Sequence, residues 1–188
     1  MDKISSAILK IDKALDKKIC ENLSEFIEIS PSVKATILKD NTNYEDTKSR
    51  NVDTVPLNFN KEQDVLYRKI IFETCCKAIE KYSKMFTSLY QELKFESVNF
   101  LKYKKGNFYK RHIDSYYQEN RQLSFIINLN EDYKGGEVIF YSPHNQLPYS
   151  KIQLKTGDLL VFPSNFMYPH SVEPILSGTR YSVVCWFS

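Results

Sequence analysis

The sequence predicts a mainly β protein of α+β type, in which a jelly roll of antiparallel strands is supported by helices from the N-terminal half. All five glycines lie between residues 106 and 178. Because glycine supplies the tight turns between short strands, the turn-rich half is the C-terminal one. From residue 95 onward, short apolar runs that suit strands replace a longer helical pattern. Eight strands without intervening helices favour an antiparallel sandwich or barrel, and a double-sheet jelly roll is its natural closure.

Two helices are expected in the N-terminal half. The first starts near Asp16 and is ended by Pro31, and its apolar residues recur at helical spacing: Ile19, Leu23, Phe26 and Ile27. The second covers about 61–85, with an apolar stripe of Leu66, Ile70, Ile71, Cys75, Ile79 and Tyr82. Between them, 33–38 is expected to be a strand and 40–53 a polar loop to which no order is assigned. The apolar faces of the helices should cover one side of a sheet.

The strands of the C-terminal half are expected at 95–103, 109–114, 122–129, 137–141, 151–154, 158–162, 169–173 and 180–187. Gly135-Gly136, Gly157 and Gly178 stand between neighbouring strands, where turns are needed.

Length and charge indicate one globular domain without a nucleic-acid partner. A chain of 188 residues can bury one sizeable core but is short for two. We therefore expect 1–188 to be a single domain, with 1–94 as helix-rich support and 95–188 as the core. The net charge of +3 is small beside 26 basic and 23 acidic residues, so no nucleic-acid partner is expected. The apolar stretch at the N-terminus is too short for a signal peptide or a membrane span, so no membrane partner is expected either.

The cysteines point to a reducing compartment. Cys20, Cys75, Cys76 and Cys185 show no C-x-x-C spacing, which is typical of reduced thiols and predicts a cytoplasmic protein. Cys75 and Cys76 are interpreted as packing residues of the second helix. No feature of the sequence indicates an oligomeric state.

A histidine and an aspartate two positions apart, His112 and Asp114, are the first metal-ligand candidates. In an extended strand, residues two apart point to the same face, so both side chains could reach one ion. An imidazole nitrogen and a carboxylate oxygen suit divalent iron, zinc or manganese. The triplet alone is weak evidence, because it also occurs in solvated turns. A third ligand is needed, and the remaining histidines are His144 and His170.

The last predicted strand carries an arginine that is expected to be buried. Alternation places Arg180 on one face with Ser182, Val184 and Trp186, and the other face carries Tyr181, Val183, Cys185 and Phe187. Both faces hold bulky apolar groups, so both should be covered. A buried guanidinium needs a partner because an unpaired internal charge is costly. That partner is either an internal acid, such as Asp158 or Glu173, or the carboxylate of a bound ligand.

The joint spacing of these residues resembles a known family. It consists of Tyr103-x-x-Gly106-x-x-Tyr109-x-x-His112-x-Asp114, Gly135-Gly136-Glu137, Gly157-Asp158, Pro169-His170-x-Val172-x-Pro174 and Gly178-Thr179-Arg180, with Trp186. From about residue 95 to the C-terminus, this pattern resembles the prolyl 4-hydroxylase group of non-haem iron(II), 2-oxoglutarate-dependent dioxygenases. The likeness is closest to the oxygen-sensing and collagen prolyl hydroxylases. The family fold, a cupin-like double-stranded β-helix of eight strands, agrees with the strands counted above.

The resemblance implies a role for several residues. His112, Asp114 and His170 match the family's iron ligands and thus its catalytic centre, and Arg180 matches the residue that pairs with the distal carboxylate of 2-oxoglutarate. The implied cofactors are Fe(II), 2-oxoglutarate and O2, with ascorbate as a reductant. Tyr103 matches a tyrosine near the cosubstrate. Trp186 matches an aromatic residue of the same pocket, but core packing would explain this tryptophan nearly as well.

The chain also departs from the family. At Asn128 the oxygen-sensing hydroxylases carry a tyrosine that touches the cosubstrate, so Asn128 or Ser124 is expected to contact 2-oxoglutarate instead. Tyr109 and Arg121 adjoin the segment that forms a mobile flap over the substrate in related enzymes, and they are candidate substrate contacts.

Two tyrosines and one histidine are left out of the site. Tyr116 and Tyr117 are interpreted as surface residues beside the flap segment. His144, between Pro143 and Asn145, is placed in a loop and excluded from the metal site.

The resemblance implies hydroxylation of an unactivated C–H bond, with a prolyl residue in a peptide or protein as the expected substrate. Three alternatives stay open. A related hydroxylase could act on a free amino acid or another small molecule. Oxidative demethylation of a nucleic-acid base uses similar chemistry, but no basic and aromatic reading surface stands out. A non-enzymatic jelly-roll module that binds a ligand is the third, although it would not need His112, Asp114, His170 and Arg180 together.

Overall fold

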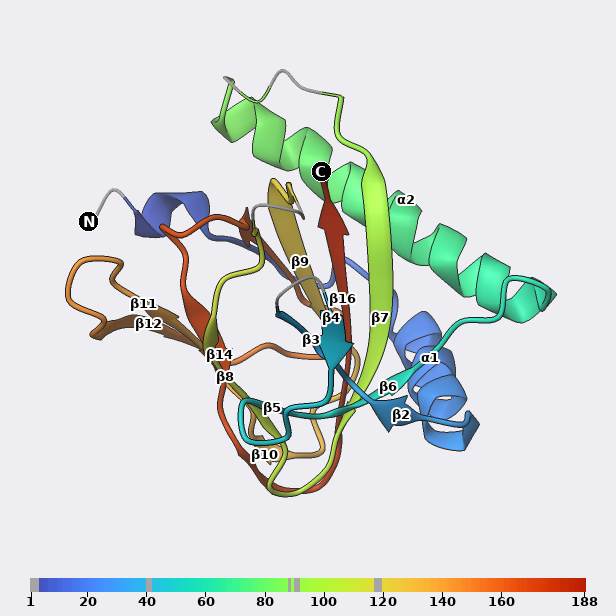
Figure 1. Cartoon of the computed structure of the whole chain (residues 1–188). Coiled ribbons are helices and arrows are strands. Elements are labelled where there is room, and N and C mark those ends of the chain that lie inside the picture. The colour runs from blue at the N-terminus through green and yellow to red at the C-terminus, as the bar shows by residue number, and fades with distance from the viewer. Residues whose placement is uncertain (1–3, 40–41, 88, 90–91, 117–119) are drawn as a thin grey trace.

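Two antiparallel sheets form the centre of the computed structural model, which describes residues 4–39, 42–87, 89, 92–116 and 120–188. Within these residues, the larger sheet has seven strands in the order β1-β13-β9-β16-β7-β6-β2. The smaller sheet has five described strands in the order β12-β11-β14-β8-β5. The long strands β7 and β16 lie side by side, and helix α2 crosses them diagonally (Figure 1).

All eight strands expected from residue 95 onward are present. They are β7 (Phe95–Tyr103), β8 (Phe108–His112), β9 (Leu123–Asn128), β11 (Val138–Tyr141), β12 (Pro148–Ile152), β13 (Leu159–Pro163), β14 (His170–Val172) and β16 (Arg180–Phe187). Each sheet contains four of these eight, so the fold is the expected double-stranded β-helix, or jelly roll. The expected bounds differ from the structure most clearly at β12, which starts at Pro148, and at β8, which ends at His112.

Two short strands of the C-terminal half were not expected. β10 (Lys134–Gly135) pairs with β15 (Ile175–Ser177). Gly135 has a φ of +82°, and a Cβ there would lie 2.2 Å from the carbonyl oxygen of Pro174. At Gly136, with a φ of +69°, a Cβ would lie 3.0 Å from Cδ of Arg180. Gly135 therefore permits the close pairing of β10 with β15, and Gly136 leaves room for the side chain of Arg180.

The N-terminal half contains strands that its helical pattern did not predict. They are β1 (Leu9–Ile11), β2 (Val33–Lys34), β3 (Ile37–Lys39), β4 (Thr42–Tyr44), β5 (Arg50–Asn51) and β6 (Asp53–Val55). The strand expected over 33–38 is present but divided, because β2 and β3 are separate strands. The prediction of a polar loop over 40–53 was wrong, because β5 joins the smaller sheet and β6, which starts at Asp53, joins the larger one. Strands of two or three residues are too short to show an alternating pattern.

Both expected helices are present. In α1 (Lys17–Ile29) the Asp16 carboxylate accepts hydrogen bonds from the N–H groups of the first turn, which explains where the helix begins. α2 (Glu62–Met85) follows the second predicted range, and a short 3-10 turn, η1 (Ser5–Ala7), precedes β1. The expected stripe of α2 was wrong at Leu66, which is 53% exposed, while the adjacent Tyr67 is buried. Within the described residues, neither helix has the length and apolar character needed to cross a membrane.

The helices cover one face of the larger sheet, as expected. Buried residues of α1 and α2 pack with Val183, Cys185 and Phe187 of β16, while Val184 and Trp186 face the opposite way, into a cavity between the sheets. The predicted alternation of β16 is thus confirmed. Cys75 of α2 is fully buried against Cys185, which confirms its packing role.

Candidate active site

Strand pairing brings two histidines together. β14 runs antiparallel to β8, and the register places His170 opposite His112. Their ring centroids lie 4.2 Å apart. Because residues directly opposite each other on paired strands are close neighbours, this contact follows from the pairing of the two strands and not from any local sequence signal.

Asp114 reaches the histidines from the turn that follows β8. The prediction that His112 and Asp114 share a strand was wrong, because β8 ends at His112. The backbone N–H groups of Asp114 and Ser115 both donate to the carbonyl of Ser164, which follows β13. This anchoring brings Oδ1 of Asp114 to 3.3 Å from Nε2 of His112, and Oδ2 to 3.6 Å from Nε2 of His170.

The three side chains form a cluster that suits a metal ion. Their candidate ligand atoms all lie within 4.8 Å of one another. Nδ1 of His112 lies 2.9 Å from the carbonyl oxygen of Lys110, and Nδ1 of His170 lies 3.1 Å from that of Tyr168. Because a carbonyl oxygen only accepts, each Nδ1 carries the proton and each Nε2 is left as a ligand atom. Two imidazoles and one carboxylate are the donor set of non-haem iron(II) sites.

Burial and mutual contact set the protonation of this cluster. Burial by itself would raise the pKa of Asp114, but the neighbouring His170 and His112 outweigh it and hold this pKa well below its usual range. Burial, together with His112, lowers the pKa of His170 to about 4. At neutral pH the cluster therefore contains an ionised carboxylate and a neutral His170 imidazole, the forms that bind a metal.

The cluster opens into a cavity of about 490 Å³ between the two sheets. Tyr103, Tyr109 and Trp186 contribute aromatic surface to its lining. A cavity of this size, lined by aromatic side chains together with convergent polar groups, is typical of a ligand-binding site.

Ser124 holds the carboxylate ligand in place. Its hydroxyl donates a 2.6 Å hydrogen bond to Oδ2 of Asp114 and lies 2.7 Å from the hydroxyl of Ser164. Ser124 is not one of the described residues that line the cavity. Its expected contact with 2-oxoglutarate stays a prediction, and its observed partner is the metal-ligand candidate itself.

Ser124→Ala is expected to weaken iron(II) binding by about tenfold or more, because partners that orient metal ligands typically contribute 10–100-fold to affinity. Equilibrium dialysis under anaerobic conditions measures this affinity. Ser83→Ala, on α2, is the matched control, because it removes a hydroxyl far from the cluster. An unchanged iron affinity in Ser124→Ala would contradict the orienting role.

Arg180 is buried at the start of β16, with 1% of its surface exposed. No carboxylate among the described residues forms an ion pair with it, and Asp158 pairs instead with Lys10 at 2.8 Å. Nε of Arg180 donates to Oδ1 of Asn128 at 3.0 Å. Within the described structure, Nη2 of Arg180 and the hydroxyl of Ser182, two residues along the same strand face, have no hydrogen-bond partner. Such buried polar groups need acceptor atoms that the described residues do not supply.

Asn128 positions the arginine. Its Oδ1 also accepts a 3.1 Å hydrogen bond from the hydroxyl of Tyr133, and its amide nitrogen donates to two backbone carbonyls. Every polar atom of the amide is therefore engaged. A direct contact between Asn128 and 2-oxoglutarate stays a prediction.

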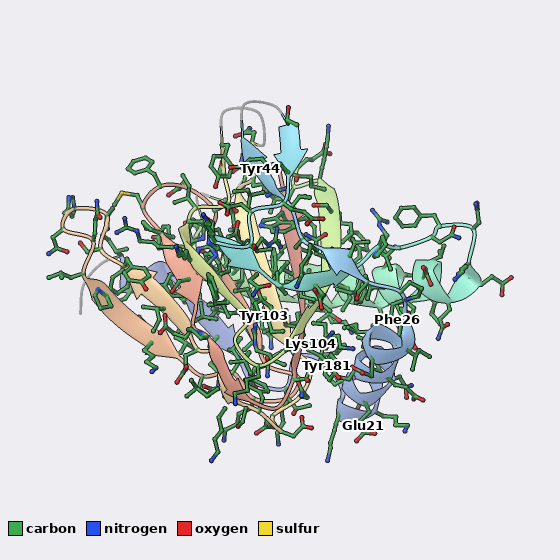
Figure 2. The ribbon with its side chains drawn as sticks, turned by 60° about the horizontal axis from the view of Figure 1, so that its bottom comes forward. Glu21, Phe26, Tyr44, Tyr103, Lys104 and Tyr181 are labelled. Carbon is green, nitrogen blue, oxygen red and sulfur yellow. The ribbon has the colours of Figure 1, made fainter. Side chains whose placement is uncertain are left out.

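Tyr103 connects the arginine to the cavity. The guanidinium carbon of Arg180 lies 5.2 Å from the centre of the Tyr103 ring, and Tyr103 lines the cavity near the centre of the molecule (Figure 2). Burial raises the pKa of Tyr103 although Arg180 opposes this effect. The phenol is therefore neutral at physiological pH and can both donate and accept a hydrogen bond.

The two substrate candidates also line the cavity. The ring of Tyr109 stacks on His112, with centroids 3.5 Å apart. Arg121 forms a 2.7 Å ion pair with Glu96, and its guanidinium carbon lies 4.1 Å from the centre of the Trp186 ring. Trp186 therefore contributes to the cavity and not to core packing alone. The roles of Tyr109 and Arg121 in binding substrate stay predictions.

The residues left out of the site divide into three cases. Tyr116 is 43% exposed, as a surface residue should be, yet it also contributes to the cavity lining. Tyr117 lies outside the described residues. His144 is exposed in the turn between β11 and β12 and takes no part in the cluster of His112, Asp114 and His170.

Three further residues of the site were not identified from the sequence. Ser164 anchors the Asp114 turn, and its position after β13 carries no sequence signal. Arg50 lines the cavity from β5, within a segment to which no order had been assigned. Ser182 could have been found, because strand alternation places it on the face of Arg180.

A match to a known family covers the part of the chain that holds these residues. Residues 98–188 match the model of the 2OG-Fe(II) oxygenase superfamily. The matched region includes the His-Asp-His cluster and Arg180, and the superfamily is named for the iron and the cosubstrate that these residues suit.

Part of the chain is also similar to hydroxylases. A PKHD-type hydroxylase of Prochlorococcus marinus (strain AS9601) is 36% identical over 93 residues, a match that covers 47% of this chain and 40% of that protein. The match thus covers less than half the length of that relative.

Solved structures share the fold over almost the whole chain. A prolyl hydroxylase from Trichoplax adhaerens, in complex with a peptide fragment of hypoxia inducible factor, has a TM-score of 0.78 at 18% identity, covering 96% of this chain and 83% of that one. A prolyl-4-hydroxylase of Pseudomonas putida has a TM-score of 0.71 at 19% identity, covering 96% and 91%. At such low identity the likeness concerns the fold.

Proposed function

We propose that this chain is an iron(II)- and 2-oxoglutarate-dependent dioxygenase that hydroxylates a prolyl residue in a peptide or protein. One observation carries the proposal: a buried arginine without a carboxylate partner in the described structure lies against Tyr103, which lines the cavity that also contains the His-Asp-His cluster. A folded protein rarely keeps a buried charge that its own residues do not neutralise. A ligand with a carboxylate supplies the missing partner.

The residues present fit both groups. His112 and His170, through Nε2, and Asp114, through its carboxylate, would hold the iron. Arg180 would bind the distal carboxylate of 2-oxoglutarate with its planar fork, and Ser182 has a free hydroxyl on the same strand face to add a further hydrogen bond. When bound, iron and 2-oxoglutarate together supply the oxidising chemistry, using O2, that a C–H bond requires.

The contribution of the protein is positioning and the exclusion of water. Asn128 fixes Nε of Arg180, so that the rest of the guanidinium faces the ligand in one orientation. Ser124 keeps Oδ2 of Asp114 in place. Tyr103 and Trp186 line the cavity with aromatic surface, which reduces the access of water to the reacting groups.

A prolyl residue is the favoured substrate because solved prolyl hydroxylases share the fold, and the Trichoplax structure holds a peptide. Hydroxylation of a free amino acid or other small molecule is the second candidate, which a cavity of about 490 Å³ also suits. A jelly-roll module that binds a ligand without reaction is disfavoured, because it needs no metal-binding triad.

The test combines iron(II), ascorbate, 2-oxoglutarate and a library of proline-containing peptides. We expect 2-oxoglutarate to be converted to succinate, and mass spectrometry to find peptides that gained one oxygen atom on proline. Oxygen gained by free amino acids and not by peptides would favour the second candidate. A failure to convert 2-oxoglutarate under any of these conditions would revive the non-enzymatic module.

We further propose that 1–188 acts as one domain in the cytoplasm. The packing of α1 and α2 on the larger sheet, with β2 and β6 at its edge, supports one domain. The cysteines Cys20, Cys75, Cys76 and Cys185 are free thiols, which supports a reducing compartment.

A further inference from the structure

The cavity carries more positive charge than the proposed cofactors use. Four basic residues line it, namely Arg50, Lys110, Arg111 and Arg121, whereas Asp114 is the sole carboxylate among its described lining residues. Asp114 is already engaged by two histidines, and Arg121 pairs with Glu96. An excess of cations around a cavity attracts a further anion.

Arg50 is the buried member of this group, with 9% of its surface exposed. Its Nη1 donates to the carbonyl of Thr36 at 2.7 Å, while its Nε has no hydrogen-bond partner in the described structure. No carboxylate among the described residues forms an ion pair with it. A guanidinium has five N–H donors, and the one on Nε is buried without a partner among the described residues. A buried cation of this kind is suited to a ligand's carboxylate.

The position of Arg50 relates it to the metal cluster. The pairing of β5 with β8 places Arg50 opposite Tyr109, and its guanidinium carbon lies 4.8 Å from the centre of the Tyr109 ring. The same ring also stacks on His112, with centroids 3.5 Å apart. The ring of Tyr109 therefore contacts both the guanidinium of Arg50 and a metal-ligand candidate. An extended peptide covers about 3.3 Å per residue. A substrate residue whose carboxylate is held by Arg50 would therefore lie within about two residues of the hydroxylated residue.

We propose that Arg50 binds a carboxylate of the substrate, and that the substrate is an acidic peptide with a glutamate or aspartate close to the hydroxylated residue. The proposal rests on the proposed function, whose substrate class it narrows. The same chemistry is available from the α-carboxylate of a free amino acid, so the experiment includes an arm for each source.

The peptide arm compares matched probes. The probes are hexapeptides with blocked termini, each with one proline and one glutamate. The glutamate stands one or two positions before or after the proline, which gives four peptides. Each peptide has a twin, in which glutamine replaces the glutamate. Calorimetric titration uses the full chain loaded with Zn(II), which is redox-inert, and 2-oxoglutarate. At least one glutamate peptide is expected to bind about tenfold more tightly than its twin, the effect of one charge-assisted hydrogen bond.

Variants connect this preference to Arg50. Arg50→Gln is expected to abolish the preference for glutamate, and Arg50→Lys to retain part of it, because lysine keeps the charge without the planar fork. Arg68→Gln is the matched control, since it removes the same charge from α2, where Arg68 lies over the ring of Phe95. Circular dichroism of each variant confirms that it is folded.

The small-molecule arm compares free L-proline with L-prolinamide. A preference for proline that Arg50→Gln removes would support the carboxylate contact and assign its source to the α-carboxylate. Equal affinities within every matched pair, a preference that survives in Arg50→Gln, or no binding by any probe would overturn the proposal. Succinate formation from 2-oxoglutarate is measured separately: turnover without a glutamate preference refutes only the Arg50 contact, and a preference without turnover refutes only the enzymatic function.

Discussion

Asp114→Ala is expected to abolish turnover and to weaken iron(II) binding by more than about 100-fold, because even residues that only orient a metal ligand contribute 10–100-fold. Asp114 is the sole anionic member of the cluster, and its Oδ1 and Oδ2 lie between the two histidines. The anchoring of this turn uses backbone N–H groups and the Ser164 carbonyl, which alanine retains. The fold should therefore survive the substitution.

Anaerobic equilibrium dialysis measures the iron affinity of Asp114→Ala, and circular dichroism its fold. His144→Ala is the matched control, because it removes a residue of a metal-ligand type from an exposed turn outside the cluster. It should bind iron like the unmodified chain. Global unfolding of Asp114→Ala would show that the carboxylate has a structural role, and unchanged iron affinity would place the metal elsewhere.

Arg180→Lys is expected to weaken 2-oxoglutarate binding by about 10–100-fold, which corresponds to the loss of one or two charge-assisted hydrogen bonds. Lysine keeps the positive charge, but its ammonium group cannot reproduce the two-pronged contact of a guanidinium with a carboxylate. It also cannot keep the Nε hydrogen bond to Asn128 while its remaining donors face a ligand. Titration of 2-oxoglutarate into the metal-loaded protein measures the effect.

Arg180→Met separates binding from folding. Because no described carboxylate pairs with Arg180, the substitution leaves no acid unpaired, and removing an uncompensated buried charge is often neutral or stabilising. We expect the thermal midpoint of the ligand-free protein to stay the same or rise, while 2-oxoglutarate binding is lost. A lower midpoint combined with unchanged 2-oxoglutarate affinity would show that the arginine serves the core and not a ligand.

Much of the fold could be predicted because its signals are local. The eight strands of the jelly roll have alternating or short apolar runs between glycine turns, and α1 and α2 have helical spacing with clear ends. The strands β2, β5 and β6 have two or three residues each. Their hydrogen bonds come from partners elsewhere in the chain, so nothing in their own sequences marks them as strands.

The site shows the same division. The spacing around His112, Asp114, His170 and Arg180 marks the proposed ligands without any structure, because the chemistry of each residue is visible in its type. The alternation prediction for Asp114 failed because the strand ends two residues before it, and the Ser164 carbonyl, far along the chain, turns the carboxylate toward the histidines. A hydrogen bond between distant segments has no local signature.

By itself, the sequence determined the type of fold, the identity of four chemically distinctive side chains and the alternation that points Arg180 inward. Only the tertiary structure decided that His170 stands opposite His112, that Arg180 has no acid beside it in the described residues, and that Arg50 shares the cavity. The physical reason is that side-chain chemistry and strand alternation are properties of neighbouring residues, whereas pairing register and the neutralisation of charge depend on segments that only folding brings into contact.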